Sequence, residues 1–551
     1  MRVAGPGRIF ILFIVSAVVL TYPLGRRLFS HIPRGDEPVG VVPFFNLWTL
    51  QWNIDQLQQG YPRYWDAPIF APDRGAFAFS ETQPLSALLA APLWLGLQSP
   101  AAGYNALVLL FLTLNGWFAY WLLRHWEVSG LSAFLAALVT QALPFVAQEM
   151  GVLQLIAVFG LLWSLLFLSL FLKQAGSDRP VWRTGFGLAL GTPVTFFTCS
   201  YYGLCSVFFL PLAFMFQFQK KHLRLKTLAQ LLAIGLILVL LSGPFLWAQQ
   251  QHLRRHGFSR SVQTIENNSA RLADYGQVLD HNLLYERLLG LESGQGQRLF
   301  LGYGLMVIAM LGLFGRQQPR VKRYLLVATL LAFGLSLGLR LDIGGFVPYG
   351  WIKLHVPGFG QLRSPFRFAA LVQVHLALLA GFGLHNVGRW FFPQRSLILP
   401  VVAALVIIEA LALPLPLQPV PPQPERIPWQ TWLDDREPAA RIVILPFAAS
   451  NRVADFEQTT RWMLANRHFQ GEMLNGYSGF FPQDHGQVRE AMLQFPTPAG
   501  IDLLREKGID FVLVFHNLTG APASEAIQTH LPIAFHDEAS QAILYSIKSP
   551  D

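Results

Sequence analysis

The feature that most constrains this fold is a series of long apolar segments, separated by short polar loops, that extends to residue 415. A helix needs about 20 apolar residues to cross a bilayer. About eleven segments approach that length, at residues 9–25, 102–123, 131–148, 152–172, 182–199, 201–218, 227–247, 299–315, 324–341, 365–387 and 396–415. Only 13% of the residues are charged, about half the fraction of a soluble protein. The sequence therefore predicts a polytopic α-helical membrane protein with about 11 transmembrane helices.

The charges of the loops predict how these helices are oriented. Lysine and arginine gather in alternate short loops, for example at Lys220, Lys221 and Arg224 and again at Arg316, Arg320 and Arg323. Cytoplasmic loops carry such an excess, so we expect a multi-pass protein of the bacterial inner membrane with a cytoplasmic N-terminus. The net charge of +9 arises mostly in these loops and does not indicate nucleic-acid binding.

The apolar segment 83–98 holds two prolines and is short for a span. If it crossed the membrane, the pattern of basic loops would invert after the first span. We therefore interpret it as a juxtamembrane helix within the first outward loop, residues 26–101. The segments 248–298, 342–364 and 416–551 then face outward as well.

The chain changes character after the transmembrane domain, residues 1–415. Residues 416–424 are rich in proline, which predicts a linker, and residues 425–551 then form an outward-facing domain. Apolar runs at 441–446, 509–515 and 542–547 predict strands, and helical spacing at 457–466 and 497–507 predicts helices. We expect a small α/β domain that acts as a lid or docking module over the membrane part.

The first outward loop carries an acidic pair, Asp36-Glu37. Ionised carboxylates are costly in hydrocarbon, so the pair must face water or a ligand. Such a carboxylate can take a proton from an acceptor hydroxyl, or hold a divalent metal, Mg²⁺ or Mn²⁺, that bridges to phosphate; Asp36 is the candidate for both roles. The structural alternative is a solvated turn at Gly35–Pro38. Glu149, at the outward end of its span, is a second candidate acid or else a headgroup-zone carboxylate.

Arginines on the outward side are candidates for binding a lipid-linked phosphate. Arg363 and Arg367 lie four residues apart at the start of the span 365–387, so they can share one helical face. A guanidinium binds phosphate through two hydrogen bonds. Arg254 and Arg255 are weaker candidates for the same role. The alternative is that these side chains anchor to lipid headgroups.

Aromatic residues complete the candidate site. Trp48, Trp52 and Trp65 lie in the first outward loop, where a flat amphipathic ring suits the headgroup region or stacks on a sugar or an isoprenoid. The sequence shows no Walker loop, dinucleotide fingerprint or Cys/His metal spacing. Glu409 is the one acid placed within a predicted span, where an acid is a candidate functional residue.

This layout resembles the GT-C superfamily of membrane glycosyltransferases, which take a sugar from a polyprenyl-phosphate carrier on the outer face of the membrane. In that superfamily the first span leads to an outward loop with an acidic pair, matched here by Asp36-Glu37. A Pro-Leu that begins a juxtamembrane helix follows, matched here by Pro84-Leu85. A narrower likeness, on residues 360–368, 475–479 and 503–514, is to mostly uncharacterised bacterial multi-span proteins, some called YfhO-like.

The resemblance implies an inner-membrane glycosyltransferase that moves a sugar from a polyprenyl-phosphate carrier to an envelope glycan, lipid or protein. Asp36, Glu37 and Glu149 would be catalytic. The arginines would hold the carrier phosphate, and the tryptophans would stack on sugar or lipid. One alternative is a flippase for a lipid-linked glycan, which the scarcity of charge within the spans disfavours. Another is a non-catalytic scaffold of an envelope polysaccharide machine.

Overall fold

The computed structural model describes residues 5–175, 181–290, 294, 296–391, 394–423, 427–519 and 521–548. The chain folds into two compact units. The first contains the residues up to Glu37, Gln83–Trp247 and Ser259–Gln418, and the second contains Pro38–Thr82, Ala248–Phe258 and the residues from Pro419 onward. The C-terminal segment thus shares its unit with two segments from the first half of the chain. Residues 424–426, where the predicted linker meets the predicted C-terminal domain, lie outside the described residues.

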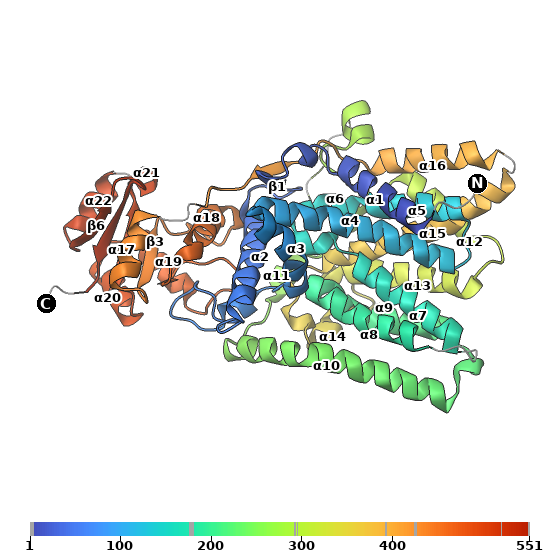
Figure 1. Cartoon of the computed structure of the whole chain (residues 1–551), viewed down its shortest axis with the longest axis horizontal. Coiled ribbons are helices and arrows are strands. Elements are labelled where there is room, and N and C mark those ends of the chain that lie inside the picture. Colours follow the sequence, from blue (N-terminus) through green and yellow to red (C-terminus); the bar gives the residue numbers. More distant parts are fainter. Residues whose placement is uncertain are drawn as a thin grey trace. The chain divides into compact units, whose positions relative to one another are not determined.

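The first unit is a bundle of helices (Figure 1). They are α1 (Pro6–Leu20), α3 (Pro84–Leu97), α4 (Pro100–His125), α5 (Gly130–Gln141), α6 (Pro144–Gln148), α7 (Phe159–Ala175), α8 (Trp182–Thr198), α9 (Ser200–Gln217), α10 (Leu225–Arg255), α11 (Val262–Asn267), α12 (Tyr303–Leu313), α13 (Pro319–Ser336), α14 (Pro348–His355), α15 (Ala369–Trp390) and α16 (Arg395–Ala410). The last turns of α10 belong to the second unit. Short strands β1 (His31–Pro33) and β2 (Leu417–Pro419) pair with each other.

Six helical stretches of the described chain are long and apolar enough to cross a membrane. They are Pro100–His125, Gly130–Gly151, Leu153–Ala175, Ser200–Gln217, Leu225–Arg255 and Pro365–Trp390. Each coincides with a predicted span, which indicates an integral membrane protein. The other predicted spans are helical too but shorter or more charged; α13, for example, opens with Arg320, Lys322 and Arg323. The total of about eleven spans therefore stays a prediction.

The helix α3 is the segment that we predicted to lie at the membrane surface. It has 14 residues, so it is about 21 Å long, which is less than the ~30 Å hydrocarbon core. Its residues Ala87, Ala90 and Trp94 are buried, whereas Leu89 and Leu93 are exposed. This one-sided burial fits a surface helix.

The helix α15 lies at the centre of the first unit and packs against α12, α13 and α5. A Cβ atom added at Gly383 would lie 1.9 Å from the carbonyl oxygen of Ile308, and one at Gly312 would lie 2.1 Å from that of Leu379. The backbones of α12 and α15 therefore touch, as is usual for small residues between membrane helices. In contrast, only 6% of the most apolar stretch of α10 is buried. The helix therefore leaves an apolar surface that lipid can cover.

Glu409 of α16 is the predicted acid within a span, and the structure gives it a structural role. Its carboxylate accepts hydrogen bonds from the backbone N–H groups of Tyr303 (2.6 Å) and Gly304 (2.7 Å) and from the hydroxyl of Tyr285. It therefore caps the first turn of α12, where a negative charge is favoured.

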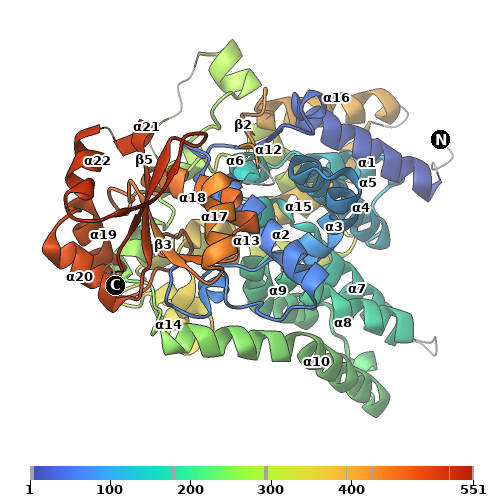
Figure 2. The same ribbon diagram turned by 60° about the vertical axis from the view of Figure 1, so that its left-hand side comes forward.

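The second unit combines α2 (Val41–Gln59) with a five-stranded mixed sheet that Figure 2 shows from a second direction. The strands are β3 (Arg441–Leu445), β4 (Glu472–Met473), β5 (Phe511–Phe515), β6 (Ile533–Asp537) and β7 (Ala542–Ser546), and their order is β4-β3-β5-β7-β6. β3 runs parallel to β4 and β5, while β7 is antiparallel to β5 and β6. The accompanying helices are α17 (Pro428–Arg436), α18 (Glu457–Ala465), α19 (His485–Leu493), α20 (Pro498–Glu506), α21 (His516–Thr519) and α22 (Ala521–Gln528).

Candidate active site

The acidic loop of the first unit follows β1 and is held against the end of α6 by backbone contacts. Gly35 has a φ of +60°, and a Cβ atom there would lie 2.8 Å from the carbonyl oxygen of Gln148. The N–H of Asp36 donates to that same oxygen over 3.2 Å. Across the contact, a Cβ atom at Gly151 would lie 2.0 Å from the carbonyl oxygen of Arg34. Only glycine fits on each side, so the two segments fix one another and bring Asp36 and Glu37 beside Glu149.

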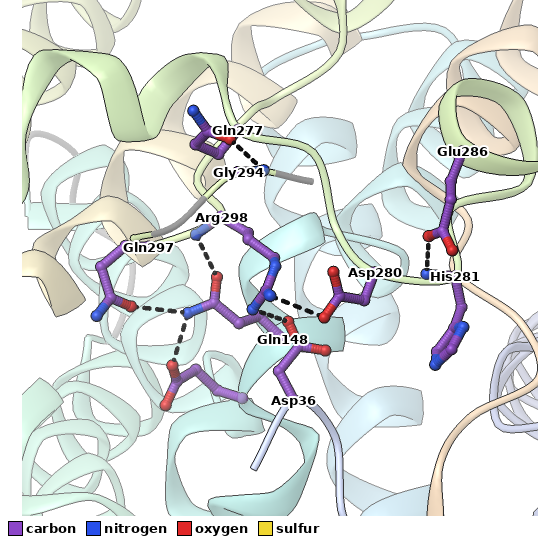
Figure 3. Close-up of polar contacts among 10 residues, drawn as sticks. Asp36, Gln148, Gln277, Asp280, His281, Glu286, Gly294, Gln297 and Arg298 are labelled. Atoms are coloured by element: carbon purple, nitrogen blue, oxygen red, sulfur yellow. Dashed lines mark hydrogen bonds and ion pairs between the residues drawn. The ribbon is translucent and has the colours of Figure 1, made fainter. Parts of the chain in front are cut away.

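The side chain of Gln148 connects Glu149 to the segment that carries Gln297 and Arg298 (Figure 3). Its Nε2 donates to Oε1 of Glu149 over 3.0 Å and to Oε1 of Gln297 over 3.2 Å. Its Oε1 accepts from the backbone N–H of Arg298 over 3.1 Å. Because both ends of the amide are engaged, the orientation of the Glu149 carboxylate is tied to the segment that carries Arg298.

Arg298 makes ion pairs with two acids, as Figure 3 shows. One terminal nitrogen lies 3.4 Å from Oδ2 of Asp36, and the other lies 2.8 Å from Oδ2 of Asp280. The Asp36 side chain is only 16% exposed, so water screens this pair weakly. Arg298 therefore orients Asp36 and offsets part of its charge.

Burial raises the pKa values of both acids of the pair Asp36-Glu37. Burial raises the pKa of Asp36 to about 7, against the opposing positive charge of Arg298. Burial and the negative charge of Glu149 raise the pKa of Glu37 to about 7, against the positive charges of Arg367 and Arg363. An acid with a pKa near neutrality is suited to accept a proton at physiological pH.

The structure places the two candidate phosphate-binding arginines near this acidic cluster, since both act electrostatically on Glu37. Arg363 precedes and Arg367 lies within the short 3₁₀ turn Pro365–Phe368, which leads into α15. The guanidinium of Arg367 also lies over the ring of Tyr201, 5.7 Å from its centre. Five of the predicted site residues, Asp36, Glu37, Glu149, Arg363 and Arg367, therefore meet in one unit.

The remaining predicted site residues belong to the second unit. Arg254 and Arg255 are exposed at the end of α10. Trp48 is buried against Phe45, and the indole N–H of Trp52 donates to the carbonyl oxygen of Tyr64 over 2.9 Å. The predicted Trp65 packs beside His252, with ring centres 5.5 Å apart.

The acidic cluster does not present a metal site. Among the residues that the structure describes, no group of three or more histidine, cysteine or acidic side chains is arranged to hold a metal ion. Asp36, the predicted metal ligand, is ion-paired with Arg298.

Changing Gly151 tests whether the contact between the two segments positions the acids. Gly151→Ala is expected to lower the activity of the site about 10²-fold, because the added Cβ must displace the loop by more than an ångström. Gly235→Ala in α10 is the matched control, since a Cβ there meets nothing within 4 Å. Activity would be measured in membranes holding equal amounts of each protein. Normal activity of Gly151→Ala would show that the contact is dispensable.

In fold, the chain is similar to GT-C glycosyltransferases. It matches the arabinofuranosyltransferase AftD from mycobacteria with a TM-score of 0.58 and 14% identity, over 100% of this chain and 40% of that chain. It matches the oligosaccharyltransferase AglB from Archaeoglobus fulgidus, in complex with an inhibitory peptide and a dolichol-phosphate, with a TM-score of 0.52 and 12% identity, over 93% of this chain and 69% of that chain. The chain thus spans about two fifths of the length of the mycobacterial protein.

The protein is therefore a helical membrane protein whose fold is similar to that of GT-C glycosyltransferases. The sequence resemblance predicted this fold. Residues 57–410 match the model of a domain of unknown function, DUF6311, and the chain belongs to this family. No curated protein matches the sequence.

Proposed function

We propose that this protein is a glycosyltransferase of the bacterial inner membrane. It moves a sugar from a polyprenyl-phosphate carrier to an envelope glycan, lipid or protein on the outer face, with about eleven spans and a cytoplasmic N-terminus. The observation that carries the proposal is the meeting of Asp36, Glu37 and Glu149 with Arg363 and Arg367 in one unit. The GT-C-like fold supports it.

The arrangement suits a single displacement. The carboxylate of Asp36 takes the proton of the acceptor hydroxyl while the hydroxyl oxygen bonds to the anomeric carbon of the sugar. The bond from that carbon to the phosphate oxygen breaks, and the polyprenyl phosphate leaves with the electron pair. Arg363 and Arg367 bind the phosphate of the carrier, in the donor and as it leaves. Arg298 holds Asp36 in place, and Gln148 holds Glu149.

The raised pKa values predict the pH dependence of transfer. The proposed base acts in its ionised form, and the pKa values of Asp36 and Glu37 are both about 7. At pH 6 such a base is about one-tenth ionised, so transfer is expected to be about one-tenth of its plateau above pH 8. Initial rates from pH 5 to pH 9 at saturating donor would measure this. A rate that is flat between pH 6 and 8 would contradict the assignment.

Donor consumption by the purified protein tests the function itself. The protein in detergent would be given polyprenyl-phosphate-linked hexoses and pentoses in one arm and nucleotide-linked sugars in the other, each with an envelope extract as the acceptor. We expect release of polyprenyl phosphate and transfer of sugar in the first arm alone. With the protein reconstituted in liposomes, translocation of an unchanged lipid-linked glycan would indicate a flippase instead, and consumption of neither donor class would favour a scaffold.

A further inference from the structure

One face of α2 carries amides and tryptophans at positions where a packing helix carries aliphatic residues. Residues that recur every three or four positions share a face of a helix. On α2 that face is formed by Trp48, Gln51, Trp52, Asp55, Gln56 and Gln59, and all six line one cavity of the second unit. The cavity has a volume of about 780 Å³, within the range of small-molecule sites. These six residues therefore form one wall of the cavity.

The opposite wall of the cavity comes from the sheet side of the same unit. It includes Asn466 and Arg467, which follow α18, Gln470, and Glu472, the first residue of β4. Gln51 and Gln56 are buried, with 2% and 3% of their surface exposed, whereas Gln59 and Gln470 are exposed. The amides of Gln59 and Gln470 therefore lie at the rim, whereas the buried Oε1 atoms of Gln51 and Gln56 accept from Gln423 and from the backbone N–H of Arg63.

The charged side chains of the cavity largely pair with one another. Arg467 donates to Asp55 through Nε and a terminal nitrogen, over distances of 2.6 to 3.2 Å. Arg74 and Arg441 both contact Glu472, at 2.6 and 3.1 Å. Burial raises the pKa of Asp55, against the opposing charge of Arg467. A strongly charged ligand would have to break these pairs, which disfavours it.

The exposed amides of the cavity, those of Gln58, Gln59 and Gln470, match sugar hydroxyls in their hydrogen bonding. An amide side chain both donates and accepts hydrogen bonds, as a hydroxyl does, so a row of amides complements a row of hydroxyls without any charge. The indole of Trp52 is held by its bond to Tyr64 and by Phe77, 6.2 Å away, and so offers a fixed flat surface. The C–H face of a sugar ring packs well on such a surface because aromatic rings bury much apolar area.

We propose that this cavity binds a neutral oligosaccharide. Its volume exceeds that of a single sugar ring, and because most of its charged side chains pair with one another, it favours an uncharged chain. Oligosaccharide binding does not depend on the enzyme assignment. The additional statement that the bound chain is the acceptor glycan rests on the proposed function.

Calorimetric titration of the full-length protein in detergent tests the proposal. The probes are neutral hexasaccharides of glucose, xylose and arabinose, an oligogalacturonate of equal length as the anionic arm, and an uncharged hexapeptide. We expect at least one neutral hexasaccharide to bind and both other arms to fail. The double variant Gln59→Ala, Gln470→Ala at the exposed rim is expected to weaken binding roughly tenfold or more. Trp52→Ala is expected to abolish it.

Matched controls separate the site from general effects. Gln487 and Gln528 are exposed glutamines of the second unit that do not line the cavity, so Gln487→Ala, Gln528→Ala is expected to bind as the wild type does. Asp36→Asn is expected to bind the hexasaccharide normally even if transfer is lost, which keeps the two proposals distinguishable. The proposal is overturned if no neutral hexasaccharide binds, if the peptide or the anionic arm binds better, or if the rim variant binds unchanged.

Discussion

Replacing Asp36 by asparagine is expected to reduce sugar transfer at least about 100-fold, because a positioned general base contributes 10²–10⁴-fold to such a step. The amide keeps the shape of the side chain and the backbone contact to Gln148, so the loop is expected to stay in place. What is lost is the proton acceptor and the ion pair with Arg298. The measurement is transfer in membranes together with the glycan profile of a deletion strain carrying each variant.

Asp342→Asn is the matched control for this experiment. Asp342 is an exposed acid of the first unit whose Oδ1 accepts from the N–H of Gly345, a bond that asparagine retains. It is expected to restore the glycan as well as the wild type does. If Asp36→Asn also restores the glycan fully at equal protein level, Asp36 is not the base and the acidic loop is only a turn.

Replacing Arg367 by alanine is expected to raise the KM for the carrier-linked donor about 30-fold, because a charge-assisted hydrogen bond contributes ~2 kcal/mol. Arg367→Lys keeps the charge but cannot form the bidentate hydrogen bonds of a guanidinium, so we expect a smaller rise in KM. Arg363→Ala is expected to act in the same direction. Steady-state kinetics with the donor as the varied substrate would measure each effect.

The control for the arginines is Arg287→Ala, an exposed arginine of the first unit on the Leu283–Leu288 turn. The KM of the Arg287→Ala variant for the carrier-linked donor is expected to match that of the wild type. Equal KM values for Arg367→Ala and Arg287→Ala would mean that Arg367 serves as a headgroup anchor rather than as a phosphate ligand.

The membrane helices were the most predictable part of the fold, because apolar length alone decides whether a helix can span. All six candidate spans of the described chain match predicted segments within a few residues, except that α10 extends to Arg255. The strands that were predicted, β3, β5 and β7, are continuous apolar runs, as buried strands are. β6 was missed because its apolar run, Ile533 to Phe535, is only three residues long and is followed by the polar His536 and Asp537.

The candidate site was predictable only in its charged members. A charged side chain beside an apolar segment is costly unless it faces water or a partner, which makes it conspicuous in the sequence. This applies to Asp36, Glu149, Arg363 and Arg367. Arg298 and Gln148 were not selected, since an arginine in a polar loop and an amide at a helix end are ordinary in sequence. Their roles arise from contacts between segments about 150 residues apart or more, which periodicity does not report.

The face of α2 that carries Gln51, Gln56 and Gln59 could be recognised in the sequence, but the sequence analysis selected only its tryptophans. The spacing of Gln51, Gln56 and Gln59 relative to Trp52 would have placed them on one side of a helix. What the sequence did not contain was the opposite wall around Asn466, which lies more than 400 residues further along the chain.

The cap that Glu409 places on α12 has a consequence for biogenesis. The first N–H groups of α12 find their acceptor in a residue 105 to 106 positions later in the chain. Unsatisfied backbone groups are costly in lipid, so α12 cannot settle at its final depth while the ribosome has yet to make α16. Its insertion is expected to be completed late, once α16 has left the translocon. A chain truncated before residue 409 should therefore leave α12 accessible to water-soluble labelling reagents.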